Sequence, residues 1–145
     1  MEAKFYKSNV YYEGLIQDFY AGAKGCFSAF MHFFYQYNQS LVFDDKISSC
    51  FKFLYLAEIE NCEKLSALLL KMGGDNKYYS SSKKFLSGYN VDYVKKNDVV
   101  ILVDVEIIEF HIIQLKNMIT KINDKKIKLV LSEILDNKKK SLNLF

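Results

Sequence analysis

The chain has 145 residues, half of them hydrophobic and 16% aromatic, which excludes disorder for most of its length. Its net charge of +3 is modest and its lysines are interleaved with acids, which argues against a nucleic-acid-binding protein. Three cysteines without paired spacing argue against a disulfide scaffold or a zinc ribbon, and no apolar run approaches membrane-spanning length.

Apolar residues spaced three and four apart predict a first long helix over residues 11–37. Cys26 lies on its apolar stripe, where we expect the thiol to pack in the core. His32 falls off the stripe, and we expect it to face solvent or a subunit partner.

A second helix is predicted over residues 44–72, and Gly73-Gly74 is a strong signal for its end. Its apolar stripe is interrupted by Glu58 and, three residues later, by Asn61. Bundle proteins of the di-iron class direct Glu-x-x-His toward a metal with this spacing. Here Asn61 stands in the position of the histidine.

The remaining periodicity predicts helices over residues 97–122 and 124–143, the first capped by Asn97-Asp98. The first and last pairs of helices are joined by short links, so each pair is expected to form an antiparallel hairpin. The segment 73–96 between the hairpins is long enough to be a crossover. We therefore predict one domain over residues 1–145, an all-α antiparallel four-helix bundle with the ferritin-like order of connections.

Aromatic side chains almost encircle the second half of the first predicted helix. One stripe builds the core, whereas the other must be covered. A homodimer is the simplest cover, and the segment 73–96 packing over these rings is the alternative. The aromatic residues are Phe27, Phe30, Phe33, Phe34, Tyr35 and Tyr37.

Several stretches resemble bacterial ferritin-like, rubrerythrin-type proteins. Tyr20-Ala21-Gly22-Ala23-Lys24-Gly25, with the aromatic helix that follows, resembles their first helix. Ala57-Glu58-x-x-Asn61, running into Lys71-Met72-Gly73-Gly74-Asp75, is similar to their second helix and its exit. Asp104-Val105-Glu106 is similar to the opening of their third helix.

The resemblance implies six metal-ligand positions, four for glutamate and two for histidine, of which this chain keeps only Glu58. The other five positions carry residues that are not carboxylates or imidazoles. Taken in chain order, the six positions are occupied by Cys26, Glu58, Asn61, Ile108, Lys138 and Ser141.

Two divalent cations need about four carboxylates for charge balance, which this set does not offer. We expect Lys138 to reach Glu58 and to replace the metal charge with an internal ion pair, because a lone buried glutamate is costly. No metal or other cofactor is therefore expected. A redox pair of Cys26 with Lys138 is a weaker idea, since a reactive thiol needs a cationic neighbour.

A relocated site for iron or manganese is the alternative, with Glu58, Glu106 and His111 as ligands. The plainer interpretation of His111 is a satisfied residue at the edge of the apolar face. Lys139 and Lys140 fit a solvated C-terminal helix end, where cations interact favourably with the helix dipole.

The leading functional hypothesis is a cytoplasmic, metal-free, non-catalytic ferritin-like protein with a structural or interaction role, most simply a homodimer. The first alternative is a ferritin-like metalloprotein that handles iron, manganese or peroxide. The second is a subunit of a protein coat or shell. No motif for nucleotide binding or acyl transfer is present.

Overall fold

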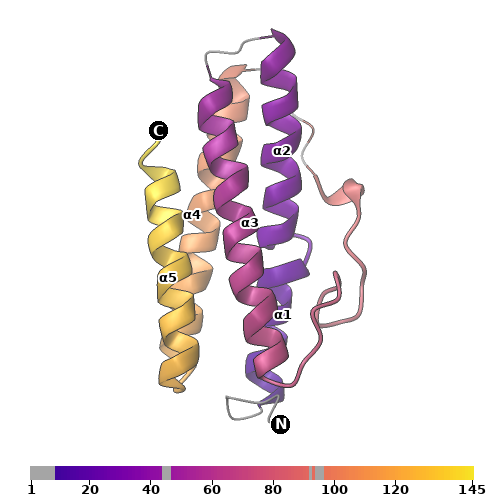
Figure 1. Cartoon of the computed structure of the whole chain (residues 1–145), viewed down its shortest axis with the longest axis vertical. Helices are drawn as coiled ribbons and strands as arrows, with labels where there is room; N and C mark the ends of the chain where they lie inside the picture. The colour runs from indigo at the N-terminus through magenta and orange to yellow at the C-terminus, as the bar shows by residue number, and fades with distance from the viewer. Residues whose placement is uncertain (1–8, 44–46, 92, 94–96) are drawn as a thin grey trace.

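The computed structural model describes residues 9–43, 47–91, 93 and 97–145, without the side chains of residues 43 and 97–99. The described chain is helical apart from its connections (Figure 1). The helices are α1 (Val10–Ala21), α2 (Cys26–Phe43), α3 (Ser48–Lys71), the 3-10 turn η1 (Gly88–Asn90), α4 (Asn97–Lys121) and α5 (Lys125–Leu142). None of the described helices is long and apolar enough to cross a membrane.

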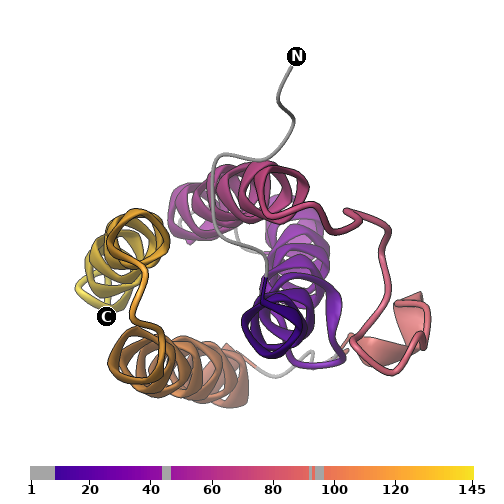
Figure 2. The ribbon, with the colours of Figure 1, turned by 90° about the horizontal axis from the view of Figure 1, so that it is seen from below.

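The helices form the predicted all-α bundle with four positions, seen end-on in Figure 2. Helices α1 and α2 follow one another in one position, and α3, α4 and α5 fill the other three. Pairs α2–α3 and α4–α5 pack as hairpins, and α3 also packs against α5. The bounds of α3, α4 and α5 agree with the predicted helices, although the predicted start at residue 44 lies outside the described residues.

The first predicted helix is in fact two helices, which corrects the prediction of one helix over residues 11–37. The last hydrogen bond of α1 runs from the Gly22 N–H to Asp18 O at 2.9 Å. The helix ends there because Gly22 itself has extended backbone (φ −71°, ψ 168°). A Cβ at Gly22 would lie 2.4 Å from Asp18 O, and a Cβ at Gly25 would lie 2.6 Å from Phe19 O. The sharp break therefore depends on glycine at both positions.

The second helix ends at the predicted glycine pair. Gly73 adopts a positive φ of 83°, and the Gly74 N–H donates to Leu69 O at 2.9 Å, which closes the last turn of α3. Helix α5 begins as predicted, because the Asp124 side chain accepts from the backbone N–H groups of Lys126 and Ile127. The predicted cap at Asn97-Asp98 lies outside the described side chains.

Two apolar clusters fill the bundle. One packs α1 against the second half of α3 and the α4–α5 hairpin, and includes Leu65, Leu115 and Ile134. The other packs α2 against the first half of α3 and α4, and includes Phe33 and Leu54. Buried polar side chains lie where the two clusters meet: Glu58, Asn61, His111 and Lys138.

Candidate functional site

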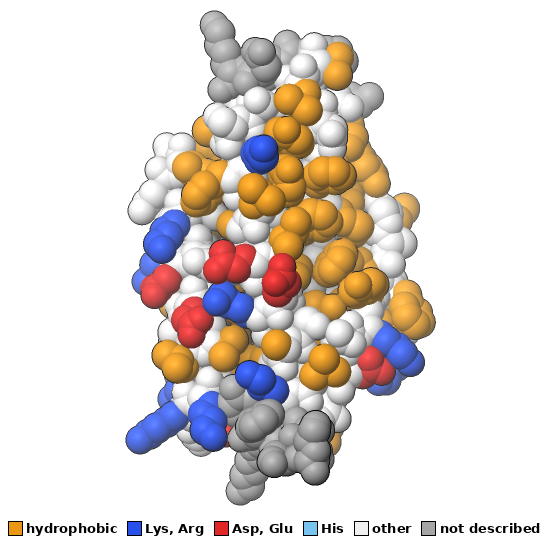
Figure 3. Space-filling view, viewed as in Figure 1, with side chains coloured by type: hydrophobic (Ala, Val, Ile, Leu, Met, Phe, Trp, Pro, Cys, Tyr) orange, Lys and Arg blue, Asp and Glu red, His pale blue; other side chains and the backbone are white. Residues whose placement is uncertain are grey.

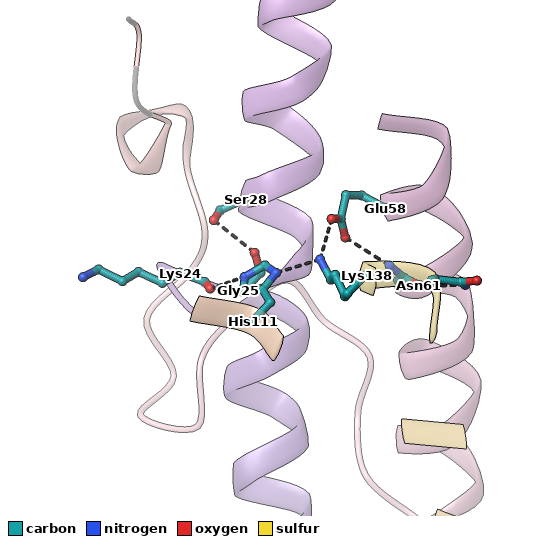
Figure 4. A network of polar contacts seen from close by, with 8 residues as sticks. Lys24, Gly25, Ser28, Glu58, Asn61, His111 and Lys138 are labelled. Atoms are coloured by element: carbon teal, nitrogen blue, oxygen red, sulfur yellow. Dashed lines mark hydrogen bonds and ion pairs between the residues drawn. The ribbon is translucent and has the colours of Figure 1, made fainter. Parts of the chain in front are cut away.

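A buried polar network joins three helices at the centre of the bundle (Figure 4). It consists of Glu58 from α3, His111 from α4 and Lys138 from α5, none of which exposes more than 1% of its surface. Lys138 Nζ contacts Glu58 Oε2 directly and lies 2.7 Å from His111 Nδ1. The contact that the sequence predicts between Lys138 and Glu58 is therefore present, and His111 is a third member.

The hydrogen bonds of His111 fix its tautomer. Its Nε2 lies 2.8 Å from the backbone oxygen of Lys24, which can only accept, so Nε2 carries the proton. His111 Nδ1 then presents its lone pair to the Lys138 ammonium. Burial, with the Lys138 charge beside it, holds the pKa of His111 well below its usual value, so the imidazole is neutral.

The break between α1 and α2 supplies the acceptor for His111. The carbonyl of Lys24 belongs to this break, so it accepts from a neighbouring helix instead of from a turn of its own (Figure 4). The same break places Cys26 at the first position of α2, fully buried beside the network.

Asn61 contributes to the network as an amide. Its Nδ2 donates to Glu58 Oε1 at 3.3 Å, and its Oδ1 accepts from Asn137 Nδ2 at 3.0 Å. Both carboxylate oxygens of Glu58 therefore have donors. The amide supports the carboxylate in the position where the family resemblance implies a metal-binding imidazole.

Three potential metal ligands converge on the network. Ligand atoms of Cys26, Glu58 and His111 all lie within 4.8 Å of one another, and all three residues are buried. Burial raises the pKa of Cys26 well above its usual value, although Lys138 opposes this shift, so the thiol is protonated. Burial by itself lowers the pKa of Lys138, but the charge of the Glu58 carboxylate and its hydrogen bond with Lys138 oppose this, and the pKa of Lys138 is raised.

The structure brings only some of the predicted site residues together. Cys26, Glu58, Asn61 and Lys138 meet at the network, whereas Ile108 packs in the apolar core next to it. Ser141 is buried near the end of α5, one turn beyond Lys138. The protonated, buried thiol of Cys26 does not fit the redox pair with Lys138, because a reactive thiol needs a lowered pKa.

Two predictions about histidines are wrong. His111 is a fully buried member of the network and not an edge residue, because its imidazole follows Ile108 by three residues on the core-facing stripe of α4. Glu106 is exposed, so the alternative ligand set loses Glu106 and gains Cys26. His32 is only 2% exposed and not at the surface, because the buried face of α2 extends beyond the apolar stripe to Ser28, His32 and Gln36.

A cavity of about 480 Å³ lies between α2 and α4 and reaches the network from the side of His111. His32 and Glu106 also line it, together with apolar residues of both helices. His32 in turn lies 3.0 Å from the buried Asp104 of α4. Sequence reasoning did not identify this second polar pair, since His32 lies beside the apolar stripe and was therefore expected outside the core.

No protein-family model matches the sequence, and no curated protein matches it significantly. Two solved structures match the fold, with TM-scores of 0.84 and 0.83. Both are of KatB, a manganese catalase from Anabaena PCC7120, at 13% identity, and they cover 99% of this chain and 73% of that chain. The chain has a ferritin-like fold.

The solved structures that share this fold correct the expectation of no cofactor. That expectation was drawn from the substituted ligand positions, and it is overturned because the matching structures are manganese proteins. A dinuclear manganese centre nevertheless does not fit the residues present. The network offers one carboxylate, one imidazole and one thiol around an ammonium, whereas two such ions need about four carboxylates.

Proposed function

We propose that this chain is a ferritin-like metalloprotein whose altered site binds a single divalent transition-metal ion. The observation that carries the proposal is the convergence of Cys26, Glu58 and His111, whose ligand atoms lie within 4.8 Å of one another. Three protein ligands of nitrogen, oxygen and sulfur leave a fourth position open, as in many mononuclear sites.

The type of ion follows from the ligands. A thiolate favours Fe²⁺, Co²⁺ or Zn²⁺ over the harder Mn²⁺ of the catalases. His111 supports this assignment, because it presents a bare Nδ1 while its Nε2–H is fixed by the carbonyl of Lys24. An ion held by these residues would supply a Lewis acid. The cavity between α2 and α4 reaches His111, one of the three ligands.

Lys138 regulates access to these ligands. Its ammonium contacts the Glu58 carboxylate and the His111 lone pair, so it supplies the positive charge that a metal would otherwise bring. A metal ion must therefore displace the ammonium and release the proton of Cys26, which makes binding weaker than at a site without the lysine.

Replacing the lysine tests this proposal. In Lys138→Met, a side chain of similar length without charge leaves the ligands free, and we expect Co²⁺ or Zn²⁺ to bind one per chain and tighter than in the native protein. Binding is measured by titration calorimetry after chelator treatment, with elemental analysis for the ratio. Co²⁺ also reports the thiolate through a charge-transfer band in the near ultraviolet.

Two further variants serve as controls. Lys139→Met removes an exposed charge from the next position of α5 and should leave binding unchanged. Cys26→Ser in the Lys138→Met background should abolish the charge-transfer band and weaken binding. Absence of stoichiometric metal from both the native and the Lys138→Met protein would contradict the proposal, as would binding that Cys26→Ser leaves intact.

A further inference from the structure

A groove of about 490 Å³ lies between the second half of α3 and the helices on either side of the α1–α2 break. Four aromatic rings line it, from Tyr20, Phe27, Phe30 and Tyr78. Tyr78 belongs to the crossover, and its ring centroid lies 4.7 Å from that of Phe27. Phe27 also meets Tyr20 and Phe30 edge-on, at centroid distances of 6.2 Å and 5.8 Å. The groove therefore has one continuous aromatic wall.

The polar groups beside this wall hydrogen-bond within the protein or are uncharged. The Tyr20 hydroxyl donates to Asn76 O at 2.9 Å, and Asn76 Nδ2 donates to Ser66 Oγ at 2.9 Å. Burial is the main cause that raises the pKa of Tyr20 to about 12, so its phenol is neutral. Burial also raises the pKa of the Cys62 thiol above its usual value, so this lining residue is neutral too.

Glu63 is the one charged side chain in the described lining of the groove. Its neighbour Glu60 lies 3.8 Å from the ammonium of Lys64, whereas within the described residues the Glu63 carboxylate has no ion pair. The charge of Glu63 contributes to the raised pKa of Cys62, so the carboxylate lies near the thiol in the lining. The groove therefore has a negative charge that its own side chains do not neutralise.

We propose that this groove binds a quaternary ammonium ion, with its methyl groups against the aromatic rings and near the Glu63 carboxylate. Aromatic faces attract cations through the ring quadrupole, and the carboxylate adds a Coulomb attraction. A primary ammonium fits less well, because its three N–H donors lose water and find Glu63 as their one charged acceptor. A quaternary ammonium has no donors to satisfy. The ligand does not require the metal ion proposed above.

Choline and two analogues test the class of ligand. 3,3-Dimethyl-1-butanol has the same shape without the charge, and ethanolamine has the charge without the methyl groups. We expect choline to bind about fivefold or more tightly than either analogue. NMR titration of the full chain with chelator present measures the affinities. The N-methyl protons of bound choline should also show nuclear Overhauser contacts to aromatic ring protons.

Two matched pairs of variants test the location. Tyr78→Leu removes a ring from the groove, whereas Tyr89→Leu removes the same ring from an exposed crossover position outside it. Glu63→Gln removes the lining carboxylate, whereas Glu60→Gln removes the same charge three residues earlier on α3. We expect the two groove variants to weaken choline binding about threefold or more and the two controls to leave it unchanged. Tyr78 and Glu63 are both exposed, so neither substitution should prevent folding.

Three results would overturn the inference: no saturable binding of choline, equal or tighter binding of either analogue, or equal effects within either pair of variants. A second copy of the chain covering the groove would also abolish choline binding, and light scattering of the same sample would identify this case. Cys26→Ser removes a proposed metal ligand and should leave choline affinity unchanged. Loss of metal binding with choline binding intact would therefore concern only the metal site.

Discussion

Lys138 is a fully buried lysine that contacts two polar side chains from two other helices. An unpaired ammonium in this position would be costly, and so would an unpaired Glu58 carboxylate. Each group therefore makes burial of the other tolerable. The consequence is that the two residues should behave as a unit when they are mutated.

The first prediction concerns that unit. Glu58→Leu and Lys138→Met should each lower the free energy of unfolding by about 3–5 kcal/mol in metal-free protein, because one buried charge loses its partner. The double variant Glu58→Leu/Lys138→Met should recover most of this loss, since neither charge remains. Denaturant unfolding measures all three, and additive losses in the double variant would contradict the coupling.

The second prediction concerns pH and His111. The pKa of His111 is lowered in the folded protein by burial and by Lys138, whereas in the unfolded chain it titrates near its usual value. Below that pH the unfolded chain binds a proton that the folded chain does not. The free energy of unfolding therefore decreases as the pH is lowered. The loss should be about 1.4 kcal/mol between about pH 7.5 and about pH 5.5.

His111→Gln is the comparison for this pH effect, with both proteins in chelator. Its stability should change less over the same interval, because the variant lacks the imidazole. The groups facing His111 are Lys138, Glu58 and Cys26, and the variant retains all of them. Equal slopes for the two proteins would contradict the assignment of a neutral, buried His111.

At the scale of elements, the break between α1 and α2 positions much of the site. It provides the Lys24 carbonyl for His111 and places Cys26 at the start of α2. These effects depend on Gly22 and Gly25, where a Cβ would collide with the backbone of α1.

The third prediction tests these glycines. Gly22→Ala should destabilise the protein by more than about 1 kcal/mol, because its Cβ would approach Asp18 O too closely. Gly14→Ala is the matched control within α1, where the nearest atom to a new Cβ is at an ordinary 3.8 Å. That variant should stabilise the protein by about 0.4–1 kcal/mol. Similar effects of the two substitutions would show that the break does not need glycine.

At the scale of the whole molecule, apolar side chains gather over α2 and α3 on the face shown in Figure 3. Exposed members from the two helices include Phe34, Leu41, Phe53 and Leu56. Phe34 also stacks with Phe30 and meets Tyr55 edge-on, so the aromatic surface continues between the helices. This face is the one on which the predicted homodimer would form.

The fourth prediction is that the protein is a dimer through this face. Light scattering after size exclusion should give twice the chain mass, and Phe53→Asp should shift the protein to the monomer. Leu129→Asp, at an exposed apolar position of α5, is the control and should remain dimeric. A monomeric native protein would contradict the prediction, as would equal effects of the two substitutions.

The sequence predicted most of the bundle, because its signals are local. Turn and cap residues, together with the spacing of apolar residues, predict three features of the fold. These are the end of α3 at Gly73-Gly74, the start of α5 at Asp124 and the long crossover between the hairpins. The break at Gly22 was missed, since single glycines within a periodic helix do not show whether the chain bends. The position of His32 was wrong for a different reason, because the buried face of α2 extends beyond the predicted apolar stripe to Ser28, His32 and Gln36.

The sequence by itself determined the all-α fold and the contact of Glu58 with Lys138, because both residues lie on apolar stripes that face one core. The family resemblance had already placed Cys26 at this site, but only the tertiary structure decided that His111 joins Glu58 and Lys138 and that Glu106 does not. The tertiary structure alone also showed that His32 lies within hydrogen-bond distance of Asp104. The physical reason is that periodicity fixes which side of a helix is buried, whereas the axial level and rotation of neighbouring helices are set by packing across the bundle.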